Sequence, residues 1–167
     1  MLKKGRMAKE LEQFALNDSM TGLYNRNAYS YYVQSEPDIA NAMVVTFDLN
    51  NLKKCNDEHG HNAGDEYIIH TAQIIESVFE KYGKCYRIGG DEFCCVVPEA
   101  QKCPIDRLIQ IMHEELVFLN NKKIIPTRAE IACGYAVVED GDDGIEQIRE
   151  RADVMMYRDK NRLKQKN

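Results

Sequence analysis

The stretch of sequence that decides the fold occupies residues 85–97 and reads CYRIGGDEFCCVV. Two largely apolar runs flank the residues Gly-Gly-Asp-Glu, which is the pattern of two antiparallel strands joined by a tight turn. Glycine allows a positive φ in such a turn and lets the backbone approach a ligand closely. Two adjacent carboxylates, Asp91 and Glu92, are costly to hold together unless a cation lies nearby. The stretch therefore predicts a β-hairpin that carries a metal and phosphate site at its tip.

The composition is that of an ordinary globular protein of one domain. The 167 residues are 44% hydrophobic and 29% charged, which is enough to form a substantial core. The net charge of −5 argues against a broad DNA-binding or RNA-binding face. No apolar run is long enough to cross a bilayer. The six cysteines form no CxxC pair, so we expect reduced thiols in a cytoplasmic protein rather than a zinc site.

The order of the predicted elements indicates an α+β fold with mixed α/β layers. Residues 1–17 are charged and carry one apolar stripe, so we expect an N-terminal linker or signalling helix before a domain at 18–167. Residues 42–49 read AMVVTFDL, which suits a buried central strand. Gly60 and Gly64 are expected to bracket a turn. Helical spacing or polarity predicts helices over 26–33, 53–58, 63–82, 105–119 and 145–160, and a further strand is expected over 127–138.

Three acidic residues are expected to meet at one edge of the sheet. Asp48 ends the central strand, whereas Asp91 and Glu92 lie in the hairpin. If the strands are neighbours, these hard oxygen ligands suit Mg²⁺ or Mn²⁺, which also bind phosphate oxygens. Lys53 and Arg87 lie close in sequence and could neutralise a triphosphate. Each acid alone is usually a helix cap or a turn former, so the prediction rests on their combination with the Gly-Gly turn.

Five segments, in order along the chain, resemble the motifs of one family. They are DSMTGLYNR at 18–26, DLNNLKKCND at 48–57, GHNAGD at 60–65, RIGGDEF at 87–93 and ADVMMYRDK at 152–160. Over residues 18–162 the chain thus resembles the GGDEF family, the diguanylate cyclase domains. The resemblance implies a central, mostly antiparallel sheet flanked by helices, similar to the polymerase palm and the nucleotidyl cyclase catalytic domain. It also implies the condensation of two GTP molecules into cyclic di-GMP, with release of two pyrophosphates.

The resemblance assigns metal-binding and catalytic roles to particular residues. Asp48 and Asp91 would bind the divalent metal through their side chains, and Leu49 through its backbone carbonyl. Asp91, with Glu92 beside it, would help to deprotonate or position the ribose 3′-hydroxyl, because a free hydroxyl is a poor nucleophile at neutral pH. Lys53 and Lys160 would neutralise the charge of the departing pyrophosphate.

The base-reading residues follow from the same resemblance. Asn56 and Asp65 would bind guanine, with His61 close by. One carboxylate can accept both the N1–H and the exocyclic amine of guanine, and adenine cannot match that pattern. Asp65 also suits the first turn of a helix, and His61 alone would more often be a surface residue. Tyr157 is expected to lie in the core.

Two departures from the family pattern are visible. Asn50 stands where the family has a second acid, and we expect activity to survive because the first acid carries most of the metal binding. Residues 80–83 read EKYG where many members have an R-x-x-D product-inhibition site. Glutamate cannot replace the planar fork of arginine, so we predict no feedback inhibition through that site.

The resemblance also implies partners. Each domain would hold one GTP, and a transient homodimer would be required for activity, so the isolated domain is expected to be mostly monomeric and weakly active. A sensor domain usually precedes the N-terminal helix in the family, and we expect that one is missing from this chain. A catalytically weak or inactive GTP-binding regulatory module is the alternative. An interaction domain without a nucleotide is a third reading, which the five ordered motifs disfavour.

Overall fold

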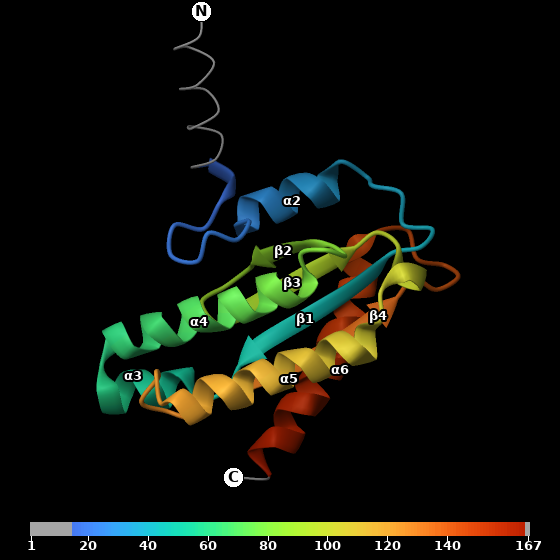
Figure 1. The fold of residues 1–167 in the computed structure, drawn as a ribbon. Helices are drawn as coiled ribbons and strands as arrows, with labels where there is room; N and C mark the ends of the chain where they lie inside the picture. Colours follow the sequence, from blue (N-terminus) through green and yellow to red (C-terminus); the bar gives the residue numbers. More distant parts are fainter. Residues whose placement is uncertain (1–14, 166–167) are drawn as a thin grey trace, which may run out of the picture.

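The sheet of this protein has four antiparallel strands in the order β2-β3-β1-β4 (Figure 1). A computed structural model describes residues 15–165. The strands are β1 (Met43–Leu49), β2 (Lys84–Arg87), β3 (Glu92–Val97) and β4 (Ile131–Val137). The expected α+β fold with an antiparallel sheet is confirmed.

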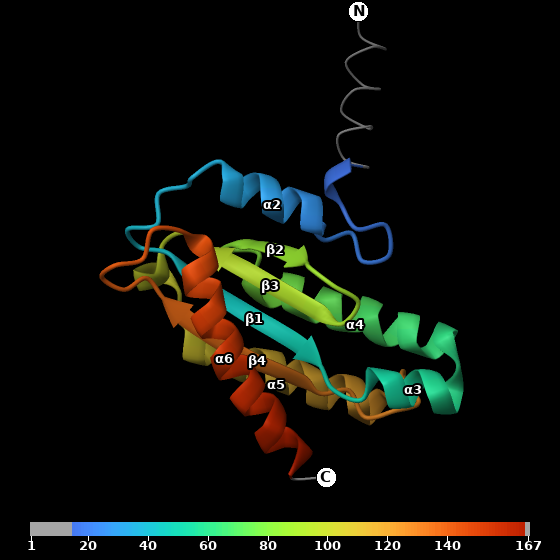
Figure 2. The same cartoon turned by 180° about the vertical axis from the view of Figure 1, so that it is seen from behind.

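Helices cover both faces of the sheet (Figure 2). They are α2 (Arg26–Gln34), α3 (Leu52–His59), α4 (His61–Phe79), α5 (Ile105–Lys122) and α6 (Ile145–Lys164), with a 3-10 turn at Ala100–Lys102. Side chains of α4 and α5 pack on one face, whereas those of α2 and α6 pack on the other. None of the described helices is both long and apolar enough to cross a bilayer.

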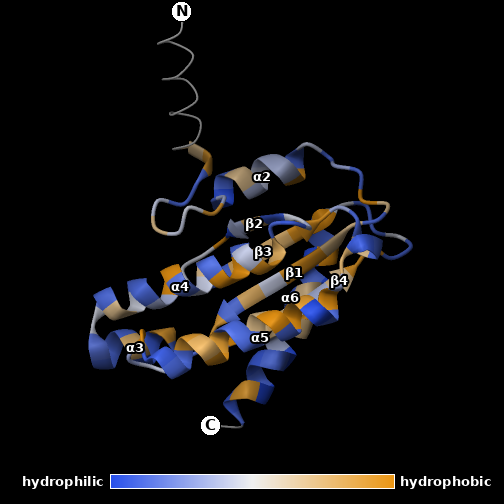
Figure 3. Ribbon diagram, in the orientation of Figure 1, coloured by the Kyte–Doolittle hydropathy of each residue, from blue (hydrophilic) through white to orange (hydrophobic). Residues whose placement is uncertain are grey.

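The central strand β1 is buried along its whole length. Successive side chains of a strand point to opposite faces. Accordingly, Val45 and Phe47 join the core beneath α4 and α5, whereas Val44 joins the core beneath α2 and α6. Strands β1 and β3 are mostly pale to orange, whereas the helices carry hydrophobic and hydrophilic residues side by side (Figure 3). Burial on both faces explains why the sequence of β1 is an almost continuous apolar run.

A glycine lets α6 approach β4 very closely. A Cβ atom built on Gly134 would lie 2.1 Å from the backbone nitrogen of Met156. No side chain can therefore be accommodated at this position without moving the helix. The close contact fixes α6 on the sheet and with it the position of Lys160 near the end of β1.

Several expectations about local structure are wrong. Gly60 alone makes the turn between α3 and α4, with φ +86°, so Gly64 lies inside α4 rather than at a turn. The hairpin glycines, Gly89 and Gly90, are not among the described glycines with positive φ, which are Gly22, Gly60 and Gly141. Tyr157 is not a core residue, because it is 62% exposed.

The ends of two elements also differ from expectation. The last strand begins at Ile131 because Asn120 hydrogen-bonds both backbone groups of Ala129, which replaces strand pairing there. Of the predicted helix at 1–17, residues 1–14 lie outside the described part of the chain. The prediction of a linker or signalling helix therefore stays a prediction.

Candidate active site

Three carboxylates meet where β1 and β3 pair. Asp48 of β1 stands opposite Glu92 of β3, and the backbone N–H of Leu49 donates to the carbonyl of Asp91 at 3.1 Å. One oxygen each from Asp48, Asp91 and Glu92 lies within 4.8 Å of the others. Asp48 is buried, Asp91 half-buried and Glu92 exposed. The expected convergence of these acids is confirmed, whereas their roles stay predictions.

The electrostatics of this cluster favour a bound cation. Burial raises the pKa of the Asp48 carboxyl, the hydrogen bond from Lys160 opposes that rise, and the charge of Asp91 adds to it. Lys160 Nζ lies 2.5 Å from Asp48 Oδ1 and is the amine that faces the cluster from α6. Carboxylates that repel each other in a partly buried place are relieved by a divalent ion, and a set of hard oxygens fits Mg²⁺ or Mn²⁺.

A buried tyrosine fixes the segment that follows Asp48. The hydroxyl of Tyr67 lies 2.8 Å from the carbonyl of Asn50 and 3.0 Å from that of Glu130, and it accepts the N–H of Glu130 at 2.7 Å. From the sequence, Tyr67 is only one residue of the helix predicted over 63–82. The signal that could have identified its role is chemical, because a buried tyrosine hydroxyl needs a partner. The side chain of Asn50 is also buried, and neither its oxygen nor its nitrogen has a hydrogen-bond partner within the described part of the chain.

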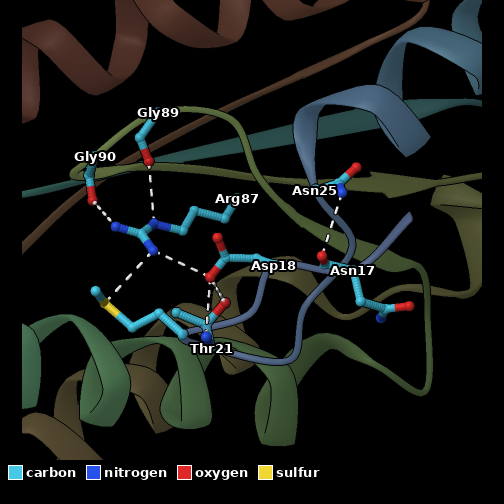
Figure 4. Close-up of polar contacts among 8 residues, drawn as sticks. Asn17, Asp18, Thr21, Asn25, Arg87, Gly89 and Gly90 are labelled. Carbon is cyan, nitrogen blue, oxygen red and sulfur yellow. Dashed lines mark hydrogen bonds and ion pairs between the residues drawn. The ribbon is translucent and has the colours of Figure 1, made fainter. Parts of the chain in front are cut away.

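The Gly-Gly turn is held from below by Arg87 (Figure 4). The guanidinium donates to the carbonyl of Gly89 at 3.2 Å and to that of Gly90 at 2.9 Å. It also donates to Asp18 Oδ2 at 3.0 Å. Arg87 thus holds both carbonyls of a turn in which neither glycine has a positive φ. The guanidinium is thus engaged within the protein, and its assignment to substrate binding stays a prediction.

Asp18 connects the N-terminal motif to this turn. Its carboxylate accepts the backbone N–H of Thr21 at 2.9 Å and the hydroxyl of Thr21 at 2.7 Å, in addition to Arg87. Burial raises the pKa of the Asp18 carboxyl, but the hydrogen bonds from Thr21 and Arg87 outweigh this, so the net pKa is lowered. Asp18 was noted only as part of a motif, and nothing in its local sequence indicated a contact with the hairpin.

The predicted base-reading residues gather where α3 and α4 meet. The carboxamide of Asn56 fills the space over Gly64, where a Cβ atom would lie 1.9 Å from Asn56 Oδ1. Asp65 follows Gly64 directly and is half-buried, as is Asn56. Lys53 and His61 are exposed. The structure thus places Asn56 against Gly64, the residue before Asp65, and the binding of guanine by Asn56 and Asp65 stays a prediction.

Comparison with known families gives a match to the family described as "Diguanylate cyclase, GGDEF domain" over residues 15–166. This chain belongs to the GGDEF family. Among curated proteins, this GGDEF domain is 30% identical over 165 residues to diguanylate cyclase DgcM of Escherichia coli, covering 93% of this chain and 38% of DgcM. It is 31% identical over 178 residues to the signaling protein YkoW of Bacillus subtilis, covering 99% of this chain and 22% of YkoW. The domain therefore spans well under half of these relatives.

Solved structures agree with the fold. The coiled coil and GGDEF domain of DgcB from Caulobacter crescentus, solved with c-di-GMP, matches with a TM-score of 0.77 at 23% identity, covering 96% of this chain and 90% of that one. A sensory box/GGDEF family protein from the same organism matches with a TM-score of 0.66 at 28% identity, covering 87% of this chain and 98% of that one. The GGDEF domain described here thus has the palm-like fold of the nucleotidyl cyclases.

Proposed function

We propose that this GGDEF domain condenses two GTP molecules into cyclic di-GMP and releases two pyrophosphates. The observation that carries the proposal is the cluster of Asp48, Asp91 and Glu92, with the amine of Lys160 beside it. The family description and the name of DgcM support the same reaction. A nucleotidyl transfer needs this combination, because negative charge builds up on the reacting phosphate while a hydroxyl must lose its proton.

The residues present fit a divalent cation. The side chains of Asp48 and Asp91, and the backbone carbonyl of Leu49, would hold Mg²⁺ or Mn²⁺. A bound cation of this kind supplies neutralisation of phosphate charge and a lower pKa for a coordinated hydroxyl. Lys160 adds a positive charge from α6 at the same place.

The remaining chemistry belongs to residues of this chain. Asp91, with Glu92, accepts the proton of the ribose 3′-hydroxyl, and the oxygen then attacks the α-phosphate of the other GTP, from which pyrophosphate leaves. Asn56 and Asp65 hold the guanine base and so orient the sugar. The exposed amine of Lys53 is available to the outer phosphates.

The product imposes a two-domain arrangement. Cyclic di-GMP contains two equivalent phosphodiester bonds, so two copies of the domain, each holding one GTP, can form both bonds by the same contacts. A transient homodimer is therefore part of the proposal. Bringing the two nucleotides together in this way supplies the orientation that free solution lacks.

The test is the conversion of GTP with Mg²⁺ and, separately, Mn²⁺, with cyclic di-GMP measured by chromatography at several protein concentrations. We expect product, a specific activity that rises with protein concentration, and its loss in Asp91→Asn. Glu115→Gln, at an exposed acid on α5, is the matched control and should keep full activity. No product, even after fusion of a dimerising coiled coil to the N-terminus, would refute the cyclase.

A GTP-binding regulatory module without activity is the second candidate, favoured by Asn50 in the position of the second acid. Calorimetry with GTP separates the two. Tight GTP binding without product supports the module, whereas product formation eliminates it.

A further inference from the structure

A groove runs along β4, on the side of that strand that faces away from β1. Its volume is about 880 Å³. Tyr135 and Val137 of β4 line it, together with Ile109 and His113 of α5 and Val154 and Arg158 of α6. We call it the β4 groove. Val137 and Val154 are 42% and 54% exposed, so apolar surface is open to solvent on two sides of the groove.

The floor of the β4 groove is a sheet edge, because β4 is the last strand of the sheet. The direction of its backbone groups follows from the pairing with β1. Val138 N–H donates to Ala42, and Asn50 N–H donates to Glu130, so the even-numbered residues of this segment face β1. The odd-numbered residues Cys133, Tyr135 and Val137 therefore present their N–H and C=O groups to the β4 groove.

Two side chains of α6 already cap part of this edge. Asp159 accepts the N–H of Cys133 at 3.0 Å, and Arg151 donates to the carbonyl of Val137 at 2.8 Å. These contacts confirm that the odd-numbered residues face outward. Within residues 15–165, no hydrogen bond engages the outward backbone groups of Tyr135 at the centre of the edge, so they are available to another strand. An edge with open N–H and C=O groups is the usual place where an extended segment is added to a sheet.

The charged side chains that line the β4 groove indicate which charge an added segment would carry. Arg151, Arg158 and Arg162 line the α6 side, against the acids Glu139 and Asp159. Arg151 and Arg162 are ion-paired within the protein. Arg158, by contrast, contacts the sulfur of Met155 at 3.8 Å, and no ion pair with an acid is found for it in the described part of the chain. The β4 groove thus carries one arginine without an acidic partner, and this charge fits an acidic side chain on a bound segment.

We propose that the β4 groove binds an extended, acidic segment of another protein, which adds to the sheet as a strand next to β4. The backbone of Tyr135 gives the central pair of hydrogen bonds. Alternate apolar side chains of the segment pack on Val137 and Val154, and an acidic side chain pairs with Arg158. The groove involves none of the carboxylates of the candidate active site, so the proposal stands independently of the cyclase reaction.

The test uses two synthetic peptides of seven residues, the length of β4, with the ¹⁵N-labelled chain. One peptide alternates glutamate and valine, and the other alternates lysine and valine. We expect the glutamate peptide to shift the amide signals of β4 and to slow hydrogen exchange at the Tyr135 N–H by about tenfold or more. The lysine peptide should leave both unchanged.

Variants of the chain locate the binding site. Arg158→Glu should weaken binding of the glutamate peptide by about tenfold, because the change removes one paired charge and adds a repulsive one. Arg107→Glu makes the same charge change at a 57% exposed side chain of α5 outside the groove and should leave binding unchanged. Both positions are exposed, so neither change should impair folding.

Four results would overturn the proposal. The first is no change in the spectrum with the glutamate peptide at about 1 mM, and the second is equally strong binding of the lysine peptide. The third is an equal loss of peptide affinity in Arg158→Glu and Arg107→Glu. The fourth is peptide binding that leaves hydrogen exchange at the Tyr135 N–H unchanged. Self-association of the chain that protects Tyr135 without any peptide would assign the groove to a second copy and would also overturn it.

Discussion

Gly64→Ala should weaken GTP binding without harming the fold, because the new methyl group would take the place of the Asn56 carboxamide. The added Cβ would lie 1.9 Å from Asn56 Oδ1 and 2.8 Å from its Cγ, and both atoms belong to the end of a flexible side chain. Asn56 can therefore rotate away at small cost. Alanine also favours the helix over glycine by about 1 kcal/mol, which offsets part of the strain.

The size of the expected loss in GTP affinity follows from the hydrogen bonds to GTP that Asn56 would lose. A polar group that no longer finds its partner in a binding site costs about 1–3 kcal/mol. That loss corresponds to GTP binding weaker by about 5-fold to 150-fold. The melting temperature should change by no more than a few degrees. Isothermal titration calorimetry with GTP and Mg²⁺, and thermal unfolding of the free protein, measure the two quantities.

A double-mutant cycle gives this prediction its control. If Gly64→Ala acts by displacing Asn56, the same change in an Asn56→Ala background should cause no further loss of affinity. Equal losses in both backgrounds, or unchanged affinity in Gly64→Ala alone, would show that the carboxamide over Gly64 does not bind the nucleotide.

Three other contacts lead to measurable effects. Asp18→Asn should lower the free energy of unfolding by about 1–2 kcal/mol at pH 7. Because folding lowers the pKa of Asp18, this difference should vanish as the pH falls below about 4, and urea unfolding that shows a constant difference down to about pH 3 would contradict the reasoning. Gly134→Ala should cost about 1–3 kcal/mol, because the new Cβ would lie 2.1 Å from a backbone nitrogen of α6, whereas Gly144→Ala, in open space, should change thermal unfolding little. Added cyclic di-GMP should cause no non-competitive inhibition of initial rates, because residues 80–83 lack the arginine and the acid of the family site, and because a side chain at Gly83 would lie 2.3 Å from a carbonyl of β3.

Local patterns in the sequence were sufficient for most of the secondary structure. The buried run of β1 and the apolar spacing of α4 and α5 each predicted an element close to the observed one. The convergence of Asp48 with the hairpin acids was also predictable, because each acid lies at or next to the end of a strand and neighbouring strands bring their ends together. These features depend on periodicity and on strand ends, which a sequence displays directly.

Contacts across long separations could not be predicted in the same way. Arg87 meets Asp18 only because the N-terminal motif folds back beside β2, where Tyr24 pairs with Tyr86. Gly64 was interpreted as a turn residue, since glycine most often signals a turn, yet here it provides room for a side chain from another helix. The exposure of Tyr157 depends on which side of α6 faces the sheet, and the helix carries polar residues nearly all round.

The central position of β1 has a consequence for the order of folding. Its partners are β3 and β4, which follow much later in the chain, whereas β2 and β3 are joined by a short turn. Pairing between distant segments is slow, because a long loop must close before any contact stabilises it. The hairpin can therefore form as soon as its residues are synthesised, whereas Asp48 meets Asp91 only when β1 has paired with β3, and Lys160 arrives only with the last helix. A nascent chain therefore completes the group of three carboxylates and one lysine only when the last helix of the domain has been synthesised and has docked on the sheet.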